Sequence, residues 1–340
     1  MLRHCQLPQV NWKEYFFVKE GTPVAYAKHN VEIARSGDIL SASLVLDNLQ
    51  GVKEVTWNFA DSQAAGIPYV RLIEAALTDK LKDKASIRVT GDQITVTFNE
   101  EMVFDRAEIV NVKVKVKVQD KLFYPIGYIN PSATIVDANG QTVKLLNGGN
   151  RFLLKPKFNR VQGYILPEGY LVEDGSYAGY RDWSKVGATL RVTNGDYSLD
   201  ATSLISSGRF NIEPLPLSKD AYTFEMKIPG HFATKQNEKF GFEYKGQLYG
   251  KSSTIRLLLV AGDVNQDNVI DVKDAIAIQD AWNTNNRAAD INFDSIVNVA
   301  DIKFVQKNYL QQNTDVPNTP APVTTLNGKT LDSILKELGL

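Results

Sequence analysis

Two segments in the last third of the 340-residue chain repeat one spacing of oxygen-bearing residues. Numbered from residues 263 and 290, each has carboxylate or amide side chains at positions 1, 3, 5, 9 and 12 and a backbone carbonyl available at position 7. Calcium prefers six to eight oxygen ligands, and alternate residues of a tight loop can supply them. The spacing therefore predicts two calcium ions. The expected ligands are Asp263, Asn265, Asp267, Val269, Asp271 and Asp274 in the first loop, and Asp290, Asn292, Asp294, Ile296, Asn298 and Asp301 in the second.

Both loops depart from the usual twelve-residue calcium loop. Glycine is expected at position 6, where these loops have Asn268 and Ser295, and position 12 is Asp instead of Glu. Position 8 is apolar, Ile270 and Val297, which predicts a short β-contact between the paired loops. Acidic turns are also common on protein surfaces. Two in tandem with every oxygen position filled favour a metal site.

The elements that would position these loops follow from the neighbouring residues. Residues 255–260 (IRLLLV) are typical of a strand and not of an entering helix. Each loop is therefore expected to precede a helix and to lack the first helix of a normal helix–loop–helix calcium site. With GDVNQDNVID leading in, residues 262–310 resemble a type I dockerin domain. The resemblance implies calcium-dependent binding to a cohesin domain in secreted bacterial assemblies. It also implies partner contacts at positions 10 and 11, where the family commonly has Ser/Thr pairs; here they are Val272, Lys273, Val299 and Ala300.

The first three quarters of the chain are dominated by short β-patterns. Residues 87–98 predict a hairpin that turns at Gly91. Residues 109–118 alternate valine with lysine, as a half-buried strand does; the lysine face is either solvated or a site for a polyanion. Residues 69–82 have helical spacing and predict one helix in this block. Later strands are expected at 161–166, 187–193, 208–213, 222–228 and 254–260.

These patterns predict a mostly β protein with two β-sandwich domains followed by a small α-helical module. Residues 29–38 (HNVEIARSGD) and 130–140 (NPSATIVDANG) make the first block similar to a cohesin-like β-sandwich. Strands at 161–165, 187–192 and 208–212 make the second similar to a carboxypeptidase regulatory-like, transthyretin-type sandwich. The turn cluster at 147–150 is the expected boundary. The predicted parts are an N-terminal tail at 1–25, sandwiches at 26–148 and 151–260, the dockerin-like module at 261–312, and a Pro/Thr linker with a terminal helix at 313–340.

Composition and motifs argue against several other classes of protein. The net charge is −1, which gives no basic footprint for nucleic acid. A single cysteine, Cys5, excludes an internal disulfide framework, and the three histidines have no metal-ligand spacing. Residues 250–252 (GKS) mimic the end of a phosphate-binding loop, but Lys245 stands where its first glycine is required. No catalytic motif is found, so the chain is predicted to be non-catalytic.

The predicted function is calcium-dependent attachment between proteins or domains, with a cohesin-like domain of the same or another chain as partner. The alternative is carbohydrate recognition by an accessory region of a secreted protease or glycosidase, through Tyr177, Tyr180 and Trp183, which could equally pack beneath their own loop. No apolar run reaches the length of a membrane span. The domain order resembles the C-terminal region of a large secreted bacterial enzyme, such as a subtilisin-like protease. The chain is accordingly expected to be a fragment of a secreted or cell-surface protein.

Overall fold

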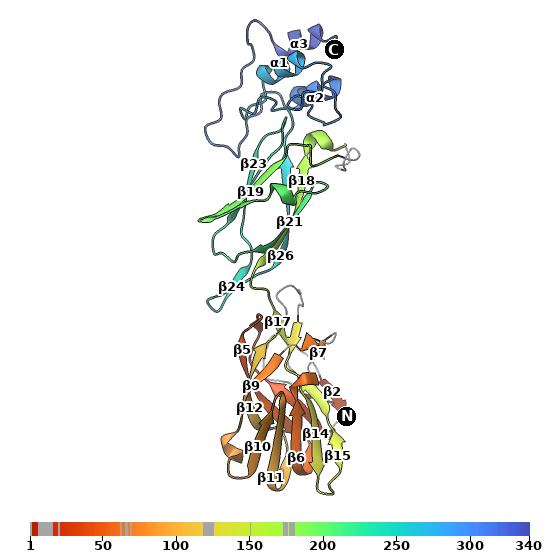
Figure 1. Cartoon of the computed structure of the whole chain (residues 1–340), viewed down its shortest axis with the longest axis vertical. Coiled ribbons are helices and arrows are strands. Elements are labelled where there is room, and N and C mark those ends of the chain that lie inside the picture. The colour runs from red at the N-terminus through yellow and green to blue at the C-terminus, as the bar shows by residue number, and fades with distance from the viewer. Residues whose placement is uncertain are drawn as a thin grey trace. The chain divides into compact units, whose positions relative to one another are not determined.

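The computed structural model describes residues 2–5, 16–19, 21–61, 63–64, 67–68, 70–117, 126–149, 151–172, 176 and 181–340. The chain divides into two compact units, residues 1–157 and 158–340 (Figure 1). The first unit has one hydrophobic core and the second has two. Because each unit buries its own apolar side chains, each meets the physical requirement for folding on its own.

The first unit is a β-sandwich of two five-stranded sheets. One sheet has the strand order β10-β11-β6-β14-β15 and the other β16-β3-β5-β12-β9. The strands of the first sheet are β10 (Ala85–Thr90), β11 (Gln93–Phe104), β6 (Leu49–Asn58), β14 (Ser132–Asp137) and β15 (Thr142–Lys144). Those of the second are β16 (Leu146–Gly149), β3 (Val24–Lys28), β5 (Ile39–Asp47), β12 (Ala107–Val116) and β9 (Val70–Leu77). All neighbours are antiparallel except β16, which runs parallel to β3.

Smaller elements complete this unit. A three-stranded sheet joins β13 (Ile126–Tyr128), β17 (Arg151–Leu154) and β4 (Ile33–Ala34). Two short hairpins pair β1 (Leu2–Cys5) with β2 (Phe16–Lys19) and β7 (Gln63–Ala64) with β8 (Ile67–Pro68). Two 3₁₀ turns, Phe59–Asp61 and Asp79–Leu81, are also present. The predicted N-terminal tail at 1–25 therefore contains paired strands and the start of β3.

Alternation in β12 places its valines in the core and its lysines in solvent, as the sequence predicts. Val112, Val114 and Val116 are buried, whereas Lys113 and Lys115 are exposed. The Nζ atom of Lys113 lies 2.8 Å from a carboxylate oxygen of Glu74 on β9. This cross-strand ion pair favours a solvated face over a polyanion site.

Two local predictions for this unit are wrong. Residues 70–77 form strand β9 in register with β12, and not the helix expected at 69–82. Ile73, which the helical spacing would bury, is 51% exposed, because period-two alternation turns Val70 and Leu72 to the core instead. The expected boundary at 147–150 is also misplaced. Residues 146–149 form β16, and the division between the units follows Lys157.

The second unit begins with another β-sandwich, which confirms the predicted fold class. Its sheets have the orders β21-β18-β26 and β20-β19-β22-β23. Only β18 and β26 pair in parallel among these strands. The strands are β18 (Asn159–Pro167), β19 (Thr189–Asn194), β20 (Tyr197–Asp200), β21 (Arg209–Leu215), β22 (Tyr222–Lys227), β23 (Thr234–Glu238) and β26 (Ser252–Leu259). A hairpin of β24 (Phe242–Tyr244) and β25 (Gln247–Tyr249) and the 3₁₀ turns Glu168–Tyr170 and Thr202–Leu204 accompany them.

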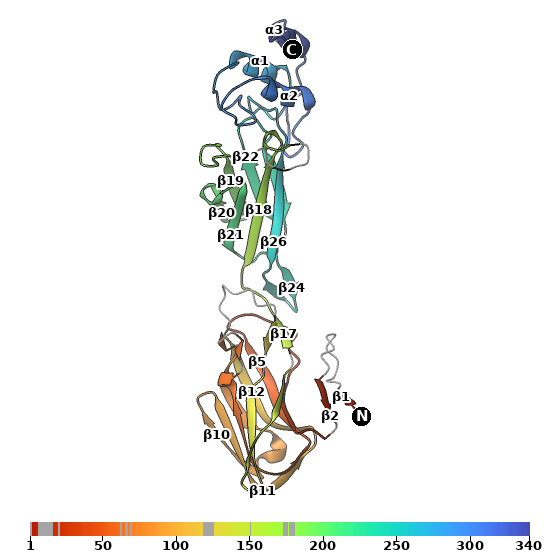
Figure 2. The same cartoon turned by 90° about the vertical axis from the view of Figure 1, so that its right-hand side faces the viewer.

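Three short helices follow the sandwich: α1 (Val272–Asp280), α2 (Val299–Lys307) and α3 (Leu331–Glu337). Figures 1 and 2 both show them gathered at one end of the second unit. Their apolar faces share a core that includes Ile278, Ile302 and Ile334. The predicted terminal helix is thus confirmed, but Val323, in the stretch expected to be a Pro/Thr linker, packs against this same core.

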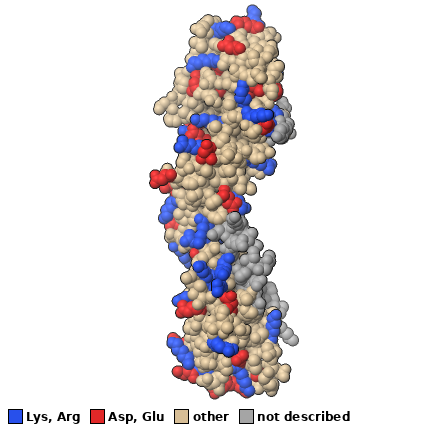
Figure 3. Space-filling model, in the orientation of Figure 1, with Lys and Arg blue, Asp and Glu red and all other residues tan. Residues whose placement is uncertain are grey.

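The described surface carries charges of both signs. Figure 3 shows lysine and arginine interspersed with aspartate and glutamate on the face it presents, in keeping with the net charge of −1. None of the described helices has the length and apolar character needed to cross a membrane.

Candidate metal centre

Each oxygen-rich loop lies directly before a helix. The first occupies the chain between the end of β26 at Leu259 and the start of α1 at Val272, so a strand precedes it, as predicted. The second ends where α2 begins at Val299. The two loops are offset by 27 positions (290 minus 263), and nearly every bond described below occurs twice with that offset.

The last residues of each loop form a capping box for the helix that follows. In the first loop, Asp271 Oδ1 accepts from Lys273 N at 2.8 Å, while Asp274 Oδ2 accepts from Asp271 N at 2.8 Å. In the second, Asn298 and Asp301 make the same pair of bonds at 2.7 and 2.9 Å. These bonds satisfy amides that a helix N-terminus leaves without partners.

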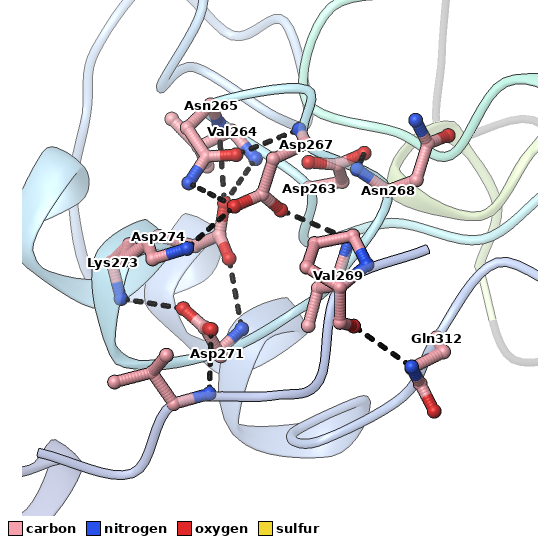
Figure 4. A network of polar contacts seen from close by, with 12 residues as sticks. Asp263, Val264, Asn265, Asp267, Asn268, Val269, Asp271, Lys273, Asp274 and Gln312 are labelled. Carbon is pink, nitrogen blue, oxygen red and sulfur yellow. Dashed lines mark hydrogen bonds and ion pairs between the residues drawn. The ribbon is translucent and has the colours of Figure 1, made fainter. Parts of the chain in front are cut away.

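The carboxylate at position 12 also closes its loop back onto the start. Asp274 Oδ1 accepts from Val264 N at 2.8 Å and from Asn265 N at 3.2 Å (Figure 4). Asp301 Oδ1 repeats this with the amides of Ile291 and Asn292, at 2.7 and 3.2 Å. Both Asp274 and Asp301 are buried. One carboxylate therefore ties the two ends of each loop together.

Side chains at positions 1, 3 and 5 also accept backbone amides of their own loop. Asp263 Oδ2 accepts from Asn268 N at 3.1 Å, and Asp290 Oδ2 from Ser295 N at 2.9 Å. The oxygens at positions 3 and 5 accept amides two residues ahead in both loops. These bonds are Asn265 with Asp267 at 2.8 Å, Asp267 with Val269 at 3.1 Å, Asn292 with Asp294 at 3.0 Å and Asp294 with Ile296 at 3.0 Å.

The tight turn at position 6 has the expected left-handed backbone. Asn268 has φ +68° and Ser295 has φ +78°, so both residues adopt the conformation that glycine takes most easily. Position 4 is left-handed as well, at Gln266 and Phe293. Nothing in the residue types at position 4 signals this, because neither Gln nor Phe favours that region.

Burial of several carboxylates within one loop perturbs their ionisation. Loss of hydration, reinforced by the neighbouring charge of Asp274, raises the pKa of Asp263 to about 8. Burial also raises the pKa of Asp274 to about 7 and that of Asp301 to about 6, against the hydrogen bonds that favour their charged forms. A cation placed among these groups would reverse the shift, since it favours the charged form of each carboxylate.

The donor set fits a hard divalent cation. Every predicted ligand residue would coordinate through an oxygen atom, which suits such a cation. Asp263 Oδ1 is also buried and has no hydrogen-bond partner among the described groups. Within the described residues, however, no three acidic, histidine or cysteine side chains converge closely enough to define a metal centre by position alone. In the first loop Lys273 Nζ lies 2.9 Å from Asp267 Oδ2, so an ammonium group already pairs with one predicted ligand.

The apolar residue at position 8 makes backbone hydrogen bonds, but not with the other loop. Ile270 bonds to the backbone of residues 310 and 311, which follow α2, at 2.7 and 2.9 Å. Val297 bonds to residues 283 and 284, which follow α1, at 2.9 and 2.7 Å. The predicted contact between the loops is therefore wrong. Each loop pairs instead with the turn that follows the other repeat's helix.

The four predicted partner contacts are not equally accessible. Val299 is 38% exposed, and Lys273 and Ala300 are partly exposed. Val272 is 0% exposed, so this residue is not a surface contact in the described structure. The aromatic patch of the alternative function also differs from expectation. Trp183 packs against the core of the second sandwich, edge-on to Tyr170, whereas Tyr177 and Tyr180 lie outside the described residues.

The residues that join the module to the second sandwich carry no signal in the sequence. Glu168 accepts from Asn308 Nδ2 at 2.7 Å, from Lys307 Nζ at 2.6 Å and from Ala261 N at 3.0 Å. The guanidinium of Arg287 donates to Val186 O at 2.9 Å and to the Tyr170 hydroxyl at 2.7 Å. Each of these contacts joins residues that are 93 to 140 positions apart in the sequence. No local pattern could therefore have indicated them.

Comparison with known proteins supports the assignment of this module as dockerin-like. Residues 261–311 match the family model of the dockerin type I domain, and they form such a domain in this chain. That family supports Ca²⁺ as the metal of the loops, and the module it describes is a non-catalytic one. A search of curated proteins finds no significant match to the chain.

Solved structures similar to the chain include a cohesin module from a family 33 glycoside hydrolase of Clostridium perfringens, with 16% identity over 39% of this chain and 96% of that one, at a TM-score of 0.30. A cohesin–dockerin complex of Clostridium thermocellum shows 8% identity over 39% and 94%, at 0.29. The major pilin BcpA of Bacillus cereus shows 9% over 70% of each chain, at 0.31.

Proposed function

We propose that this chain is a non-catalytic attachment region whose dockerin domain binds Ca²⁺ and docks onto a cohesin-like β-sandwich. The observation that carries the proposal is the buried Asp263 Oδ1, which has no hydrogen-bond partner among the described groups and lies inside a loop of oxygen ligands. A second loop repeats the bonds by which the position 12 carboxylate closes the first. A group of buried carboxylates is costly unless a cation neutralises it. Two ions, one in each loop, are proposed.

The first loop would hold its ion through Asp263, Asn265, Asp267, Val269, Asp271 and Asp274, and the second through Asp290, Asn292, Asp294, Ile296, Asn298 and Asp301. The ion would supply positive charge that holds the loop closed. The protein's own part is to orient these oxygens through the capping boxes and the left-handed turns. Because helices α1 and α2 start from the loops, metal binding and the order of the helices would be coupled.

The proposed partner is the N-terminal sandwich, either of the same chain or of another copy, or a comparable cohesin-like domain. The resemblance of residues 29–38 and 130–140 to cohesin-like strands supports this choice. The resemblance of the second sandwich to a carboxypeptidase regulatory-like domain stays a prediction. A location outside the cell or at its surface, and a secreted parent hydrolase, belong to the same proposal.

Two measurements test this function. Calorimetric titration of residues 158–340 with Ca²⁺ should show two binding events, and a chelator should abolish both. Titration of residues 158–340 with residues 1–157, with Ca²⁺ and then with chelator, should show binding only in the first case. Absence of Ca²⁺ binding would overturn the metal assignment. Binding of metal without binding of the sandwich at high micromolar concentration would overturn the partner.

A further inference from the structure

The two repeats of the dockerin domain differ in exposure at the first residue of their helices. Val272 begins α1 and Val299 begins α2, and each stands at position 10 of its loop. The side chain of Val272 is 0% exposed, whereas that of Val299 is 38% exposed. Two positions equivalent in sequence and backbone are thus buried in one repeat and open in the other.

The segment 316–340 makes this difference. Val323 N donates to Asp271 Oδ2 at 2.8 Å, and Val323 O accepts from Val272 N at 3.1 Å. Both polar groups of one backbone residue are therefore bonded to the junction between the first loop and α1. In the second repeat Asn298 stands in place of Asp271. Its Oδ1 accepts from Ala300 N at 2.7 Å, and its Nδ2, which takes the place of the second carboxylate oxygen, donates to Ile296 O at 3.3 Å.

Apolar packing holds the same segment on α1. Ile334 is fully buried, and Val323, Leu326, Leu331, Leu335 and Leu338 pack against the core that contains Val272, Ala275 and Ile278. Side-chain hydrogen bonds to Gln279 add to this packing at the last turn of α1. Lys329 Nζ donates to Gln279 Oε1 at 2.5 Å, and Gln279 Nε2 donates to Glu337 Oε2 at 2.8 Å. The segment spans the face of α1 from its first residue to its last turn.

We propose that residues 316–340 are an intramolecular cover on the partner-binding face of the first repeat. This inference rests on the proposed function, because it assigns the covered face to the same class of partner. In consequence the domain offers one open face, at Val299 and Ala300 on α2, and its partner binds in one orientation. Displacement of the cover would create a second, equivalent face at Val272 and Lys273.

The cover is tested first without any partner, in the full chain with Cys5→Ser. Val272→Cys and Val299→Cys are compared by their rates of reaction with a maleimide. Val299→Cys should react at least tenfold faster. Adding Ile334→Asp should bring the two rates to within about twofold, whereas Lys336→Gln, an exposed change of equal net charge, should leave the difference intact. Equal rates in the parent chain would overturn the proposal.

A second variant distinguishes release of the cover from unfolding of the domain caused by Ile334→Asp. Val323→Pro removes the donor to Asp271 without burying a charge, and it should also raise the rate at Val272→Cys. Calcium titration of each variant reports whether the loops remain folded. If both variants bind calcium as the parent does and Val272→Cys stays protected, the segment is not the cover.

Binding of the partner is tested by titrating residues 158–340 with residues 1–157. Val299→Asp should abolish binding, because it buries an unpaired carboxylate at the only open face. Val299→Asp combined with Ile334→Asp should restore it through the uncovered first repeat. If no form binds residues 1–157, the proposed partner fails while the thiol result stands. If the parent binds and the double variant does not, the cover does not hide a second face.

Discussion

Arg287 donates a hydrogen bond to the phenolic oxygen of Tyr170 across 2.7 Å, joining the chain before the second metal loop to the second sandwich. The same guanidinium donates to Val186 O at 2.9 Å and to Asp290 O at 2.6 Å, and it lies over the ring of Phe293. Asp290 is the first predicted ligand of that loop. One side chain therefore fixes the start of the second loop to the sandwich, and at the corresponding position before the first loop stands Val260.

Arg287→Met should destabilise residues 158–340 and weaken calcium binding at the second loop. The change leaves Asp290 O, Val186 O and the Tyr170 hydroxyl without their charged donor, a loss of about 2–4 kcal/mol in the free energy of unfolding. Urea unfolding and calorimetric calcium titration measure the two effects. Arg256→Met, on an exposed position of β26, is the matched control and should change neither.

Acid should destabilise the same junction through His231. This imidazole is buried; Gly169 N donates to its Nε2 at 3.1 Å, and its Nδ1 then donates to Pro229 O at 3.1 Å, so the neutral ring is the form that fits. Burial lowers the pKa of His231 from 6.5 to about 4. The folded state therefore binds this proton less readily than the unfolded state, and stability is full above pH 6.5 and falls as the pH drops toward 4.

Between pH 7 and pH 5 this group alone should remove about 2 kcal/mol from the free energy of unfolding. His231→Gln should reduce that slope, although it lowers stability at neutral pH. Urea unfolding of residues 158–340 at several pH values, with chelator present throughout, makes the comparison. Parallel pH profiles for parent and variant would show that His231 does not contribute.

Lys273→Gln should strengthen calcium binding at the first loop. The ammonium of Lys273 lies 2.9 Å from Asp267 Oδ2, so it competes with a cation for that oxygen. The pair is partly exposed, which limits the gain to about two- to fivefold in affinity. Lys303→Gln removes an equal charge from the exposed face of α2 and should have no such effect on the first loop. Weaker calcium binding in Lys273→Gln would contradict the idea that the two cations compete.

The two loops should differ in affinity, and Asp274→Ala should cost more than Asn298→Ala. The first loop has four carboxylates and the second three, and ligand charge raises calcium affinity. Asp274 also accepts the amides of Val264, Asn265 and Asp271, so its loss opens the loop as well as removing charge. We expect a loss of at least about tenfold for Asp274→Ala and less for Asn298→Ala. Equal losses by calorimetric titration would refute this ranking.

The loops were predictable from sequence because their information is local. Every ligand lies within twelve positions of Asp263 or Asp290, and the capping boxes follow from residue types at fixed spacing. Strand β12 was predictable for the same reason, since a period of two has one physical solution when a single face is buried. The dockerin resemblance depends on these local features and agrees with the family match over residues 261–311.

Local pattern failed where neighbours distant in sequence decided the outcome. Residues 70–77 have helical spacing, but the free backbone edge of β12 pairs with them and makes them a strand. The Pro-rich stretch near Val323 has the composition of a linker, yet the amide of Val272 and the carboxylate of Asp271 give its backbone partners.

What the sequence determined by itself is the chemistry of the chain: which oxygens stand in the loops, where each helix starts, and that most of the fold is β. What only the tertiary structure decided is the difference between the repeats. Val272 and Val299 are the same residue in the same local setting, and their exposure differs because residues 316–340 cover one of them. Burial depends on what packs above a residue, and that contact spans about fifty positions that no local spacing records.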